Sequence, residues 1–545
     1  MNQPSASGQS STEVQYRAVA PAADPTGEPL ATAAEVSLLD GILSSFSEKP
    51  SSSDKSTSDK SSGRRSEVPT QLDKFLAEKV FAERLRLWLG DSLFDRMQGA
   101  PWREVASRLQ QDVCLIDELL RKQVAAIIHN PAFQKIESSW RGVQHLLNCR
   151  EKVDDAPIQI RLLNVGWAEL RRDFDRAVEF DQSQLFRMVY ENEFGMPGGK
   201  PYAALLADFD IHPRPSSEHP HDDIAVLKSL SQVAAASFCP VFLNASPTMF
   251  GVNQFDEMQH TVDYAKIQSD LDYLGWRQFR EMEDSRFIGL VMPRMLMRRP
   301  YDQRHVAKTG FLFSEEGMNR SSHLWGGAVF AVGETLIRAY GHNRWLADIR
   351  GAQRGIDSGG LVMGPATINF TTDTPEVCPK PILDLMVNDS LERQMAELGF
   401  MSLTACPGTP LAAFYSCPST QKPKLYNTPD ATANAKISSM LNYILCVSRF
   451  AHYVKIIGRD KVGGYRDAED LQQEIYRWII DYVTSDPDAS VSVKSRRPLR
   501  AAEVIVRPDT AKPGSYTCTM NLSPHYELDD MQASIKLVAE IAGGS

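Results

Sequence analysis

The feature that most constrains the fold of this chain is an alternation of strand-like and helix-like segments in its middle region. Short runs rich in apolar and branched residues are typical of strands, whereas apolar residues recurring every three to four positions indicate helices. The two patterns predict, in chain order, a strand, a helix, a strand, a helix and a strand at residues 158–167, 170–180, 201–211, 222–238 and 238–245. We therefore expect an α/β (mixed α+β) body in which helices cover a sheet in layers.

Helical patterns dominate on either side of this region. Thr70 and Asp73 have the spacing of a helix cap ahead of an apolar run, so the folded body is predicted to begin near Thr70. A second unit is expected from about Glu376. The remaining predicted helices cover residues 102–128, 132–147, 431–457 and 468–483.

The C-terminal part of the chain changes to strand-like patterning, with strands predicted in residues 490–508, 514–524 and 533–541. Apolar and polar residues alternate there with a period of two, which predicts strands with one apolar face. The residues on the apolar faces are Tyr516, Cys518, Met520 and Leu522 in one strand and Ile535, Leu537 and Ile541 in the next. Such strands need a sheet to join.

The N-terminal tail, residues 1–66, contains one short apolar segment between two polar stretches. Residues 1–34 are rich in Ser, Ala, Pro and Gly, and residues 47–66 contain no large apolar side chain except that of Pro50. Between them, an amphipathic helix is predicted over residues 35–46, with apolar positions Val36, Leu38, Leu39, Ile42, Leu43 and Phe46. This helix either folds back onto the body or docks into a groove of another protein, and the tether-like composition of residues 47–66 favours docking.

Composition narrows the class of protein further. Apolar residues make up 42% of the 545 residues, which is typical of globular proteins, and the net charge of −10 argues against nucleic acid as a partner. The eight cysteines form no Cys-x-x-Cys pair, and the N-terminus lacks the pattern of a signal peptide. No uncharged run reaches the roughly 20 residues of a membrane span. We expect a cytoplasmic protein without membrane insertion.

Motifs that suggest chemistry fail on spacing or context. The loop GMPGGKPY, residues 195–202, has one residue too few for a phosphate-binding loop and places Pro201 at the hydroxyl position. Ser419 and Lys422 match a penicillin-binding motif, but Lys308-Thr-Gly precedes them instead of following. The histidines at 212, 219 and 221 are interpreted as a solvated loop, and His452 as a core histidine. The sequence therefore predicts no enzyme activity, no cofactor and no metal site.

Several long strings resemble one family. They are NPAFQKIESSWRGVQHLL at 130–147, YENEFGMPGGKPYAALLADFDI at 190–211, EDSRFIGLVMPRMLMRRPY at 283–301, LWGGAVFAVGETLIRAY at 324–340 and ATANAKISSMLNYILCVSRFAHYVKIIGRDKVG at 431–463. The chain resembles the large sheath subunit of the type VI secretion system, called TssC or VipB, over nearly the whole body. The resemblance implies the layered fold of contractile tail sheaths and a structural function.

The resemblance also implies partners. A small sheath subunit of the TssB or VipA type would pair with this chain, and the pairs would form a helical polymer on a baseplate, around an inner tube of stacked hexameric rings. Contraction would expel the inner tube, and the AAA+ unfoldase ClpV would recover subunits by binding an N-terminal helix, to which residues 35–46 are similar.

A terminal strand can join the sheet of a neighbour through main-chain hydrogen bonds. We therefore expect the C-terminal strands to link protomers, through the apolar positions named above and Val538. The predicted divisions are the tail 1–66, a body 67–375, a second sheath domain 376–490 and linking strands 491–545. The alternative is a sheath protein of another contractile device, such as a phage-like tail; the tethered N-terminal helix argues against it.

Overall fold

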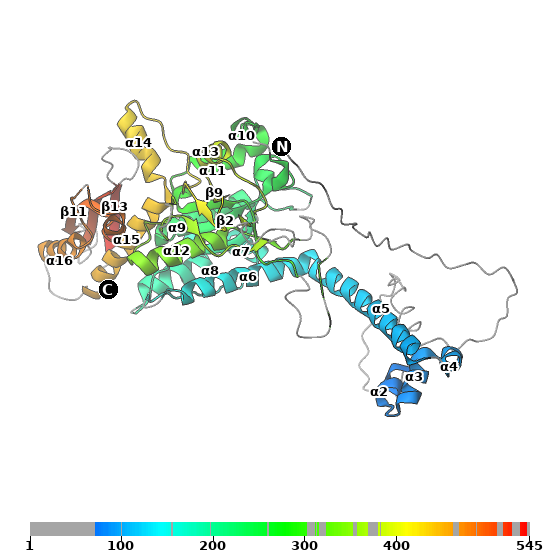
Figure 1. Ribbon diagram of the computed structural model, residues 1–545. Helices are drawn as coiled ribbons and strands as arrows, with labels where there is room; N and C mark the ends of the chain where they lie inside the picture. Colours follow the sequence, from blue (N-terminus) through cyan, green and yellow to red (C-terminus); the bar gives the residue numbers. More distant parts are fainter. Residues whose placement is uncertain are drawn as a thin grey trace, which may run out of the picture. The chain divides into compact units, whose positions relative to one another are not determined.

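The structure is a computed structural model, shown in Figure 1, and the chain divides after Leu120 into two compact units. The structure describes residues 71–99, 101–153, 156–196, 198–217, 219–258, 261–301, 311, 313–315, 323–352, 357–368, 380–381, 383–461, 468–486, 488–508, 516–525 and 535–541. In this part of the chain, no helix has the length and apolar character needed to cross a membrane.

The described part of the first unit is helical. Its helices are α2 (Gln71–Ala77), α3 (Phe81–Leu89), α4 (Asp91–Met97) and the start of α5 (Trp102–Ile128). Helix α2 begins next to the predicted cap at Thr70, and α5 has the predicted bounds. Gly90 separates α3 from α4 at φ +75°, a backbone conformation that favours glycine.

A six-stranded sheet lies at the centre of the second unit, in the order β1-β2-β3-β9-β10-β6. Its strands are β1 (Leu205–Ile211), β2 (Val241–Ala245), β3 (Ile288–Met292), β9 (Phe400–Ala405), β10 (Ala412–Phe414) and β6 (Leu361–Val362). The pairs from β1 to β9 are parallel, and β10 pairs antiparallel with both β9 and β6. Strands β2 and β3 are buried along their whole length, as expected for parallel strands covered on both faces.

The two faces of this sheet contribute to two separate hydrophobic cores. Val241, Leu243 and Leu290 face one core, whereas Phe242 and Val291 face the other, following the period of two along a strand. The first core is covered by helix α9 (Asp223–Ser237) and the second by helix α12 (Val329–Asn343), which Figure 1 shows beside the sheet. The predicted α/β layered fold is confirmed.

Helix α6 (Pro131–Glu151) packs on the outer side of α12. The two helices approach closely at Gly142, where a Cβ would lie 2.4 Å from the ring of Phe330. At Gly333 a Cβ would lie 2.5 Å from Leu146. A larger residue at either position would push the helices apart, so the glycines hold α6 against the body.

A third core lies at the C-terminal end, among helices α15 (Leu441–Lys461) and α16 (Ala468–Ile480) and a separate three-stranded sheet. That sheet has the order β11-β12-β13, with both pairs antiparallel. Its strands are β11 (Leu499–Pro508), β12 (Tyr516–Pro524) and β13 (Ile535–Ile541).

Shorter elements connect these layers. The helices are α7 (Trp167–Arg176), α8 (Gln184–Phe186), α10 (Tyr264–Ile267), α11 (Leu274–Glu281), α13 (Asp389–Glu397), α14 (Pro429–Ser438) and α17 (Val491–Arg496). The 3-10 and π segments are η1 (Phe180–Gln182), η2 (Arg187–Gly195), η3 (Pro247–Phe250), η4 (Phe255–Glu257), η5 (Leu271–Tyr273) and η6 (Asp284–Phe287). Two small ribbons pair β4 (Met295–Leu296) with β5 (Trp325–Gly326) and β7 (Thr367–Ile368) with β8 (Lys380–Pro381).

The structure corrects the prediction of a strand over residues 158–167. No described residue from 158 to 166 belongs to a strand, and Trp167 starts α7. Ile158 and Ile160 alternate with exposed residues because they pack against the second core, but the edge strand β1 pairs with β2 alone among the described residues. The alternation of apolar and polar residues therefore arises because one side of an extended segment is buried, although the segment does not pair as a strand.

Two further element boundaries differ from the prediction. The single helix predicted over 431–457 is broken between α14 and α15, because Ser439 accepts a backbone hydrogen bond from Ser419 and Leu441 donates one to Cys417. The first half of the predicted strand 490–508 is instead helix α17. Pro498 follows that helix, and the strand starts only at Leu499.

Candidate functional site

The outer face of α6 carries an exposed apolar stripe. The helix starts at Pro131, and the side chain of Asn130 caps it by accepting a hydrogen bond from the Ala132 amide at 3.0 Å. The stripe, opposite the face that packs on α12, consists of Phe133, Ile136, Trp140 and Leu147. Ile136 is 60% exposed and Trp140 is 65% exposed. Aligned at helical spacing, these side chains form a surface suited to another helix.

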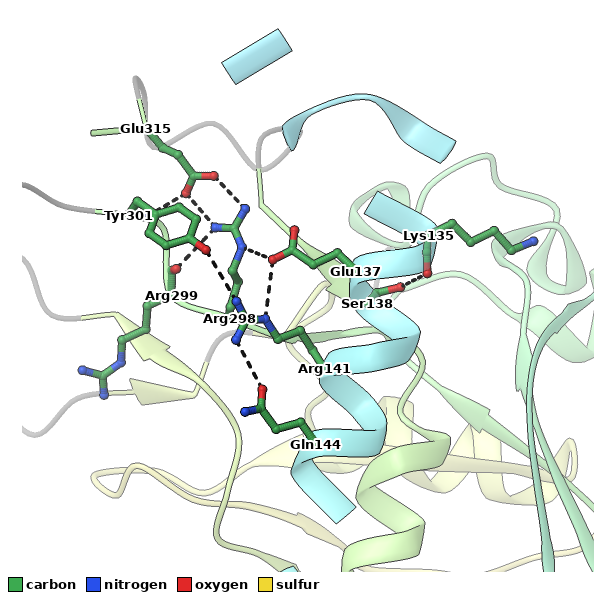
Figure 2. A network of polar contacts seen from close by, with 9 residues as sticks. All are labelled: Lys135, Glu137, Ser138, Arg141, Gln144, Arg298, Arg299, Tyr301 and Glu315. Carbon is green, nitrogen blue, oxygen red and sulfur yellow. Dashed lines mark hydrogen bonds and ion pairs between the residues drawn. The ribbon is translucent and has the colours of Figure 1, made fainter. Parts of the chain in front are cut away.

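A buried arginine fixes the edge of this stripe (Figure 2). Arg298 donates from Nε to Glu137 of α6 at 2.7 Å and from Nη1 and Nη2 to the two oxygens of Glu315, each at 2.9 Å. Burial alone would lower the pKa of Arg298, but its hydrogen bonds to Glu315 and Glu137 outweigh burial and raise that pKa. The guanidinium also lies 4.5 Å from the centre of the Tyr301 ring. The carboxylates of Glu137 and Glu315 therefore share one cation, which ties α6 to Arg298 and Glu315.

Arg141 extends the network along the stripe. Its Nε lies 3.5 Å from Glu137, and its guanidinium donates to Gln144 at 3.3 Å and to the Tyr301 hydroxyl at 3.5 Å, as Figure 2 shows. Glu137, Arg141 and Gln144 occupy positions of α6 three residues before, one after and four after Trp140, so they form a polar margin along the stripe. An apolar centre with a polar margin is the usual composition of a protein–protein interface.

The inner face of α6 contains a second polar group. Nε2 of His145 lies 2.8 Å from Oε2 of Glu334 in α12 and 3.8 Å from Sγ of Cys149, one helical turn further along α6. Burial by itself would lower the pKa of His145, but its contacts with Cys149 and Glu334 raise that pKa to about 9. The other carboxylate oxygen of Glu334 accepts a hydrogen bond from the Met363 amide at 2.6 Å. These three side chains join α6 to α12.

The first unit exposes large apolar side chains on α2, α3 and α5. Within residues 71–99 and 101–120, buried apolar side chains are few, namely Leu89 and Val105. The exposed large apolar residues are Leu72, Leu76, Val80, Phe81, Trp102, Val113, Leu115 and Leu120. One buried polar contact, from Trp88 Nε1 to Asp112 at 3.0 Å, joins α3 to α5. Helices with so little buried surface are typical of a segment that packs against a partner.

The C-terminal sheet places the predicted linking residues of β12 on one face. Cys518, Met520 and Leu522 are buried in the third core, and Tyr516 packs against it. Both edges of β12 are paired inside the chain, with β11 and with β13. The backbone of β13 contains Ile535, Leu537, Val538 and Ile541, and its register pairs Leu537 with Met520 and Val538 with Thr519. A linking role for these residues stays a prediction.

The predicted docking helix, residues 35–46, lies outside the described residues, and so do Val36, Leu38, Leu39, Ile42, Leu43 and Phe46. At the loop of residues 195–202, the Lys200 amide donates a hydrogen bond at 2.6 Å to the carboxylate of Glu193, which precedes the loop and also pairs with Arg161. His452 is a buried core residue, as predicted, with Nε2 3.0 Å from the carbonyl of Ser237. His212 stacks on His219 and bonds to Asp223 at 3.1 Å.

Sequence reasoning missed the Arg298 network and the group around His145. The sequence alone could have indicated part of the second group, because His145 and Cys149 are four residues apart in a predicted helix and so lie on one face. Their partner Glu334 is 189 residues from His145, and Arg298 is 161 residues from Glu137. Only the folded chain brings these groups together.

Comparison with known proteins agrees with this architecture. The family model VipB (EvpB/VC_A0108, tail sheath N-terminal domain) matches residues 110–421, and VipB_2 (EvpB/VC_A0108, tail sheath gpW/gp25-like domain) matches residues 430–541. The type VI secretion system sheath protein TssC1 of Pseudomonas aeruginosa is 36% identical over 438 residues, which cover 79% of this chain and 86% of that protein.

The two matched domains define a contractile tail sheath protein. More specifically, the chain belongs to the TssC/VipB family of type VI secretion sheath subunits, as its long sequence strings indicated. It is a structural subunit of the contractile sheath.

Proposed function

We propose that this chain pairs with a small sheath subunit of the TssB or VipA type through the outer face of α6, and that the pairs polymerise around a hexameric inner tube. The observation that carries the proposal is the apolar stripe of α6, with Trp140 at its centre and 65% exposed. A surface tryptophan flanked by apolar neighbours is a frequent energetic centre of protein interfaces. The occupant that fits is an amphipathic helix of the small subunit.

The charged network beside the stripe supports this assignment. Arg298 holds Glu137 in place, and Arg141 bridges Glu137 and Gln144 along the same helix. A helix held rigid before binding loses less conformational entropy when the partner arrives. The stripe is therefore a preorganised surface, and its polar margin orients the incoming helix.

The C-terminal sheet is the proposed link between protomers. Since β12 is paired on both sides, an incoming strand would add to the outer edge of β13, which has no paired strand within the described residues. The backbone of Ile535, Leu537, Val538 and Ile541 would then join the two protomers. The added strand would be part of the neighbour's sheet, so it would move with that protomer as a rigid unit when the sheath contracts.

The proposal also includes where the sheath assembles in the cell and how its subunits are recovered. The sheath would assemble on a baseplate in the cytoplasm, without nucleic acid or membrane insertion, and would expel the inner tube on contraction. Residues 35–46 would then dock into the AAA+ unfoldase ClpV, which recovers the subunits. The division into tail 1–66, body 67–375, second sheath domain 376–490 and linking strands 491–545 belongs to this proposal.

Co-purification with the small sheath subunit tests the interface. In Trp140→Asp, a charge replaces the exposed ring at the centre of the stripe, and we expect recovery of the small subunit to fall at least about tenfold, given the usual cost of losing an interface centre. Leu271→Asp is the matched control, because Leu271 in η5 is similarly exposed and lies outside α6. Equal recovery with Trp140→Asp and with the control would place the small subunit elsewhere.

A further inference from the structure

A candidate metal site lies between α6 and α12. Among the residues that the structure describes, one group of three His, Cys, Asp or Glu side chains has its ligand atoms within 4.8 Å of one another: His145, Cys149 and Glu334. His145 and Cys149 lie one turn apart on α6, and Glu334 comes from the middle of α12. The group is assembled by the packing of two long helices, on rigid elements, which is where precise ligand geometry is easiest to maintain.

From this geometry we propose that His145, Cys149 and Glu334 bind a zinc ion, with a water or a fourth ligand completing the coordination. Zn²⁺ takes four ligands at about 2.0–2.3 Å, which puts neighbouring ligand atoms about 3.5 Å apart. The observed separations from His145 Nε2, 3.8 Å to Cys149 Sγ and 2.8 Å to Glu334 Oε2, lie on either side of that value. All three ligand atoms lie within 4.8 Å of one another, so adjustments of the side-chain torsions would bring them onto one ion.

The donor set points to zinc among the common ions. A thiolate and an imidazole together suit Zn²⁺, whereas Mg²⁺ and Ca²⁺ prefer oxygen ligands alone. Zinc binding would displace the protons of His145 and Cys149 into solvent. The resulting thiolate and the carboxylate, beside a neutral imidazole, supply two negative charges, which balance those of Zn²⁺ in a largely buried place. Glu334 is 3% exposed and Cys149 8% exposed, while His145 keeps a side exposed to solvent through which an ion can reach the group.

The surroundings already orient the ligands. The Met363 amide donates to Oε1 of Glu334 at 2.6 Å, which leaves Oε2 directed at the imidazole. Gly364 lies over the ring: a Cβ there would come within 2.3 Å of Cε1 of His145. Hydrogen bonds to the second atom of a ligand and close packing around it are the usual support of a metal site.

The arrangement does not fit a catalytic cysteine. In a nucleophilic triad the base contacts the nucleophile with one ring nitrogen and its orienting carboxylate with the other. Here Cys149 and Glu334 both lie nearest to Nε2 of His145. One nitrogen facing a thiol and a carboxylate together is the geometry of ligands around a common centre.

A zinc ion in this position would fasten α6 to the body from its inner face, while the outer face carries the apolar stripe. Metal binding to the folded state raises thermal stability by linkage. The inference does not depend on where the small subunit binds, since the three ligands lie on the inner face of α6 and metal binding can be measured on this chain within the complex.

Cobalt titration of the full-length chain, kept soluble by co-expression with the small sheath subunit, tests the site. After removal of metal with EDTA, we expect about one Co²⁺ per chain to bind with a thiolate-to-cobalt charge-transfer band and the visible bands of four-coordinate cobalt, and Zn²⁺ to displace it. In Cys149→Ser the charge-transfer band should be lost, and the rise in melting temperature with Zn²⁺ should disappear. Cys114→Ser is the control, because Cys114 is an exposed cysteine of α5 outside the group, and it should behave as the unmodified chain.

Melting in EDTA, measured in parallel, shows whether Cys149→Ser is folded. An undiminished charge-transfer band in a folded Cys149→Ser would overturn the proposal. Absence of stoichiometric Co²⁺ and Zn²⁺ binding by the unmodified chain would do so as well, whatever the variant does, and would leave the group as an ion pair with a neighbouring thiol.

Discussion

The two units of the chain use similar residues in opposite ways. Trp102 in the first unit is 63% exposed, whereas Trp276 in the second is completely buried against Phe279 and Phe400. Helices α2 to α4 bury one residue, Leu89, whereas α12 buries most of its length within the second core. Both units are rich in apolar side chains, yet among the described residues the large hydrophobic cores all lie in the second.

This difference separates what stabilises the fold from what serves assembly. An isolated short helix gains little stability from its own hydrogen bonds and needs a packed apolar face. In the second unit, helices on both faces of the sheet bury their apolar faces against it. The apolar side chains of the first unit and of the α6 stripe stay exposed, which is expected of a subunit that completes its packing in a polymer.

Matched tryptophan substitutions give the largest contrast between the units. Trp276→Ala should cost about 3–5 kcal/mol of stability, because it removes a fully buried side chain and leaves a cavity. Trp102→Ala should change the stability of this chain by less than about 0.5 kcal/mol, since its side chain is largely exposed. Thermal unfolding of the two variants side by side, in solutions dilute enough to prevent aggregation, measures both. Equal costs would mean that the first unit has a core of its own.

A proline in β13 tests whether the C-terminal sheet serves the fold of the body or the assembly of protomers. Val538 pairs with Thr519 in the centre of β13, and Val538→Pro removes a main-chain donor and misfits the strand. The cost at one site is about 3 kcal/mol, by analogy with proline in a regular helix. We expect tubules to disappear and the pair with the small subunit to persist in size-exclusion chromatography, with electron microscopy of the same fractions.

Val538→Thr serves as the control for that substitution, because it keeps both the branched shape and the main-chain donor. Tubules of normal appearance from Val538→Pro would show that β13 is not the link. Loss of the pair itself would assign β13 to the packing of the body.

The smallest expected effect concerns the third core and pH. Burial, followed by the charge of Arg449, lowers the pKa of His452 to about 3. Between about pH 6.5 and pH 3 the unfolded chain therefore binds a proton that the folded chain does not, so stability falls as the pH decreases through that window. The slope from this residue is at most about 1.4 kcal/mol per pH unit. Melting temperatures from pH 7 to pH 5 should fall less steeply in His452→Gln, and an identical slope would mean that the buried histidine takes up a proton.

Features determined by residues close together in the sequence could be predicted, whereas features that depend on contacts between distant residues could not. The start of α6 was predicted from Pro131, and the one-sided burial of β12 from its alternating residues, because neighbours along the chain determine both. The break before α15 was missed because Leu441 bonds to Cys417, and the strand predicted at 158–167 failed for lack of a pairing edge. The group of His145, Cys149 and Glu334 could not be predicted, since Glu334 is 189 residues from His145 and reaches it only through the packing of α12 on α6.

The central claim is that the uncovered apolar surfaces serve a polymer built with a small sheath subunit. Negative-stain electron microscopy of the full chain, expressed alone and together with that subunit, tests it most directly. The account predicts hollow tubules from the co-expressed pair, and poorly soluble or aggregated material from this chain alone, because its exposed apolar faces remain uncovered. A stable, monodisperse monomer after solitary expression, with no tubules in the presence of the small subunit, would contradict it.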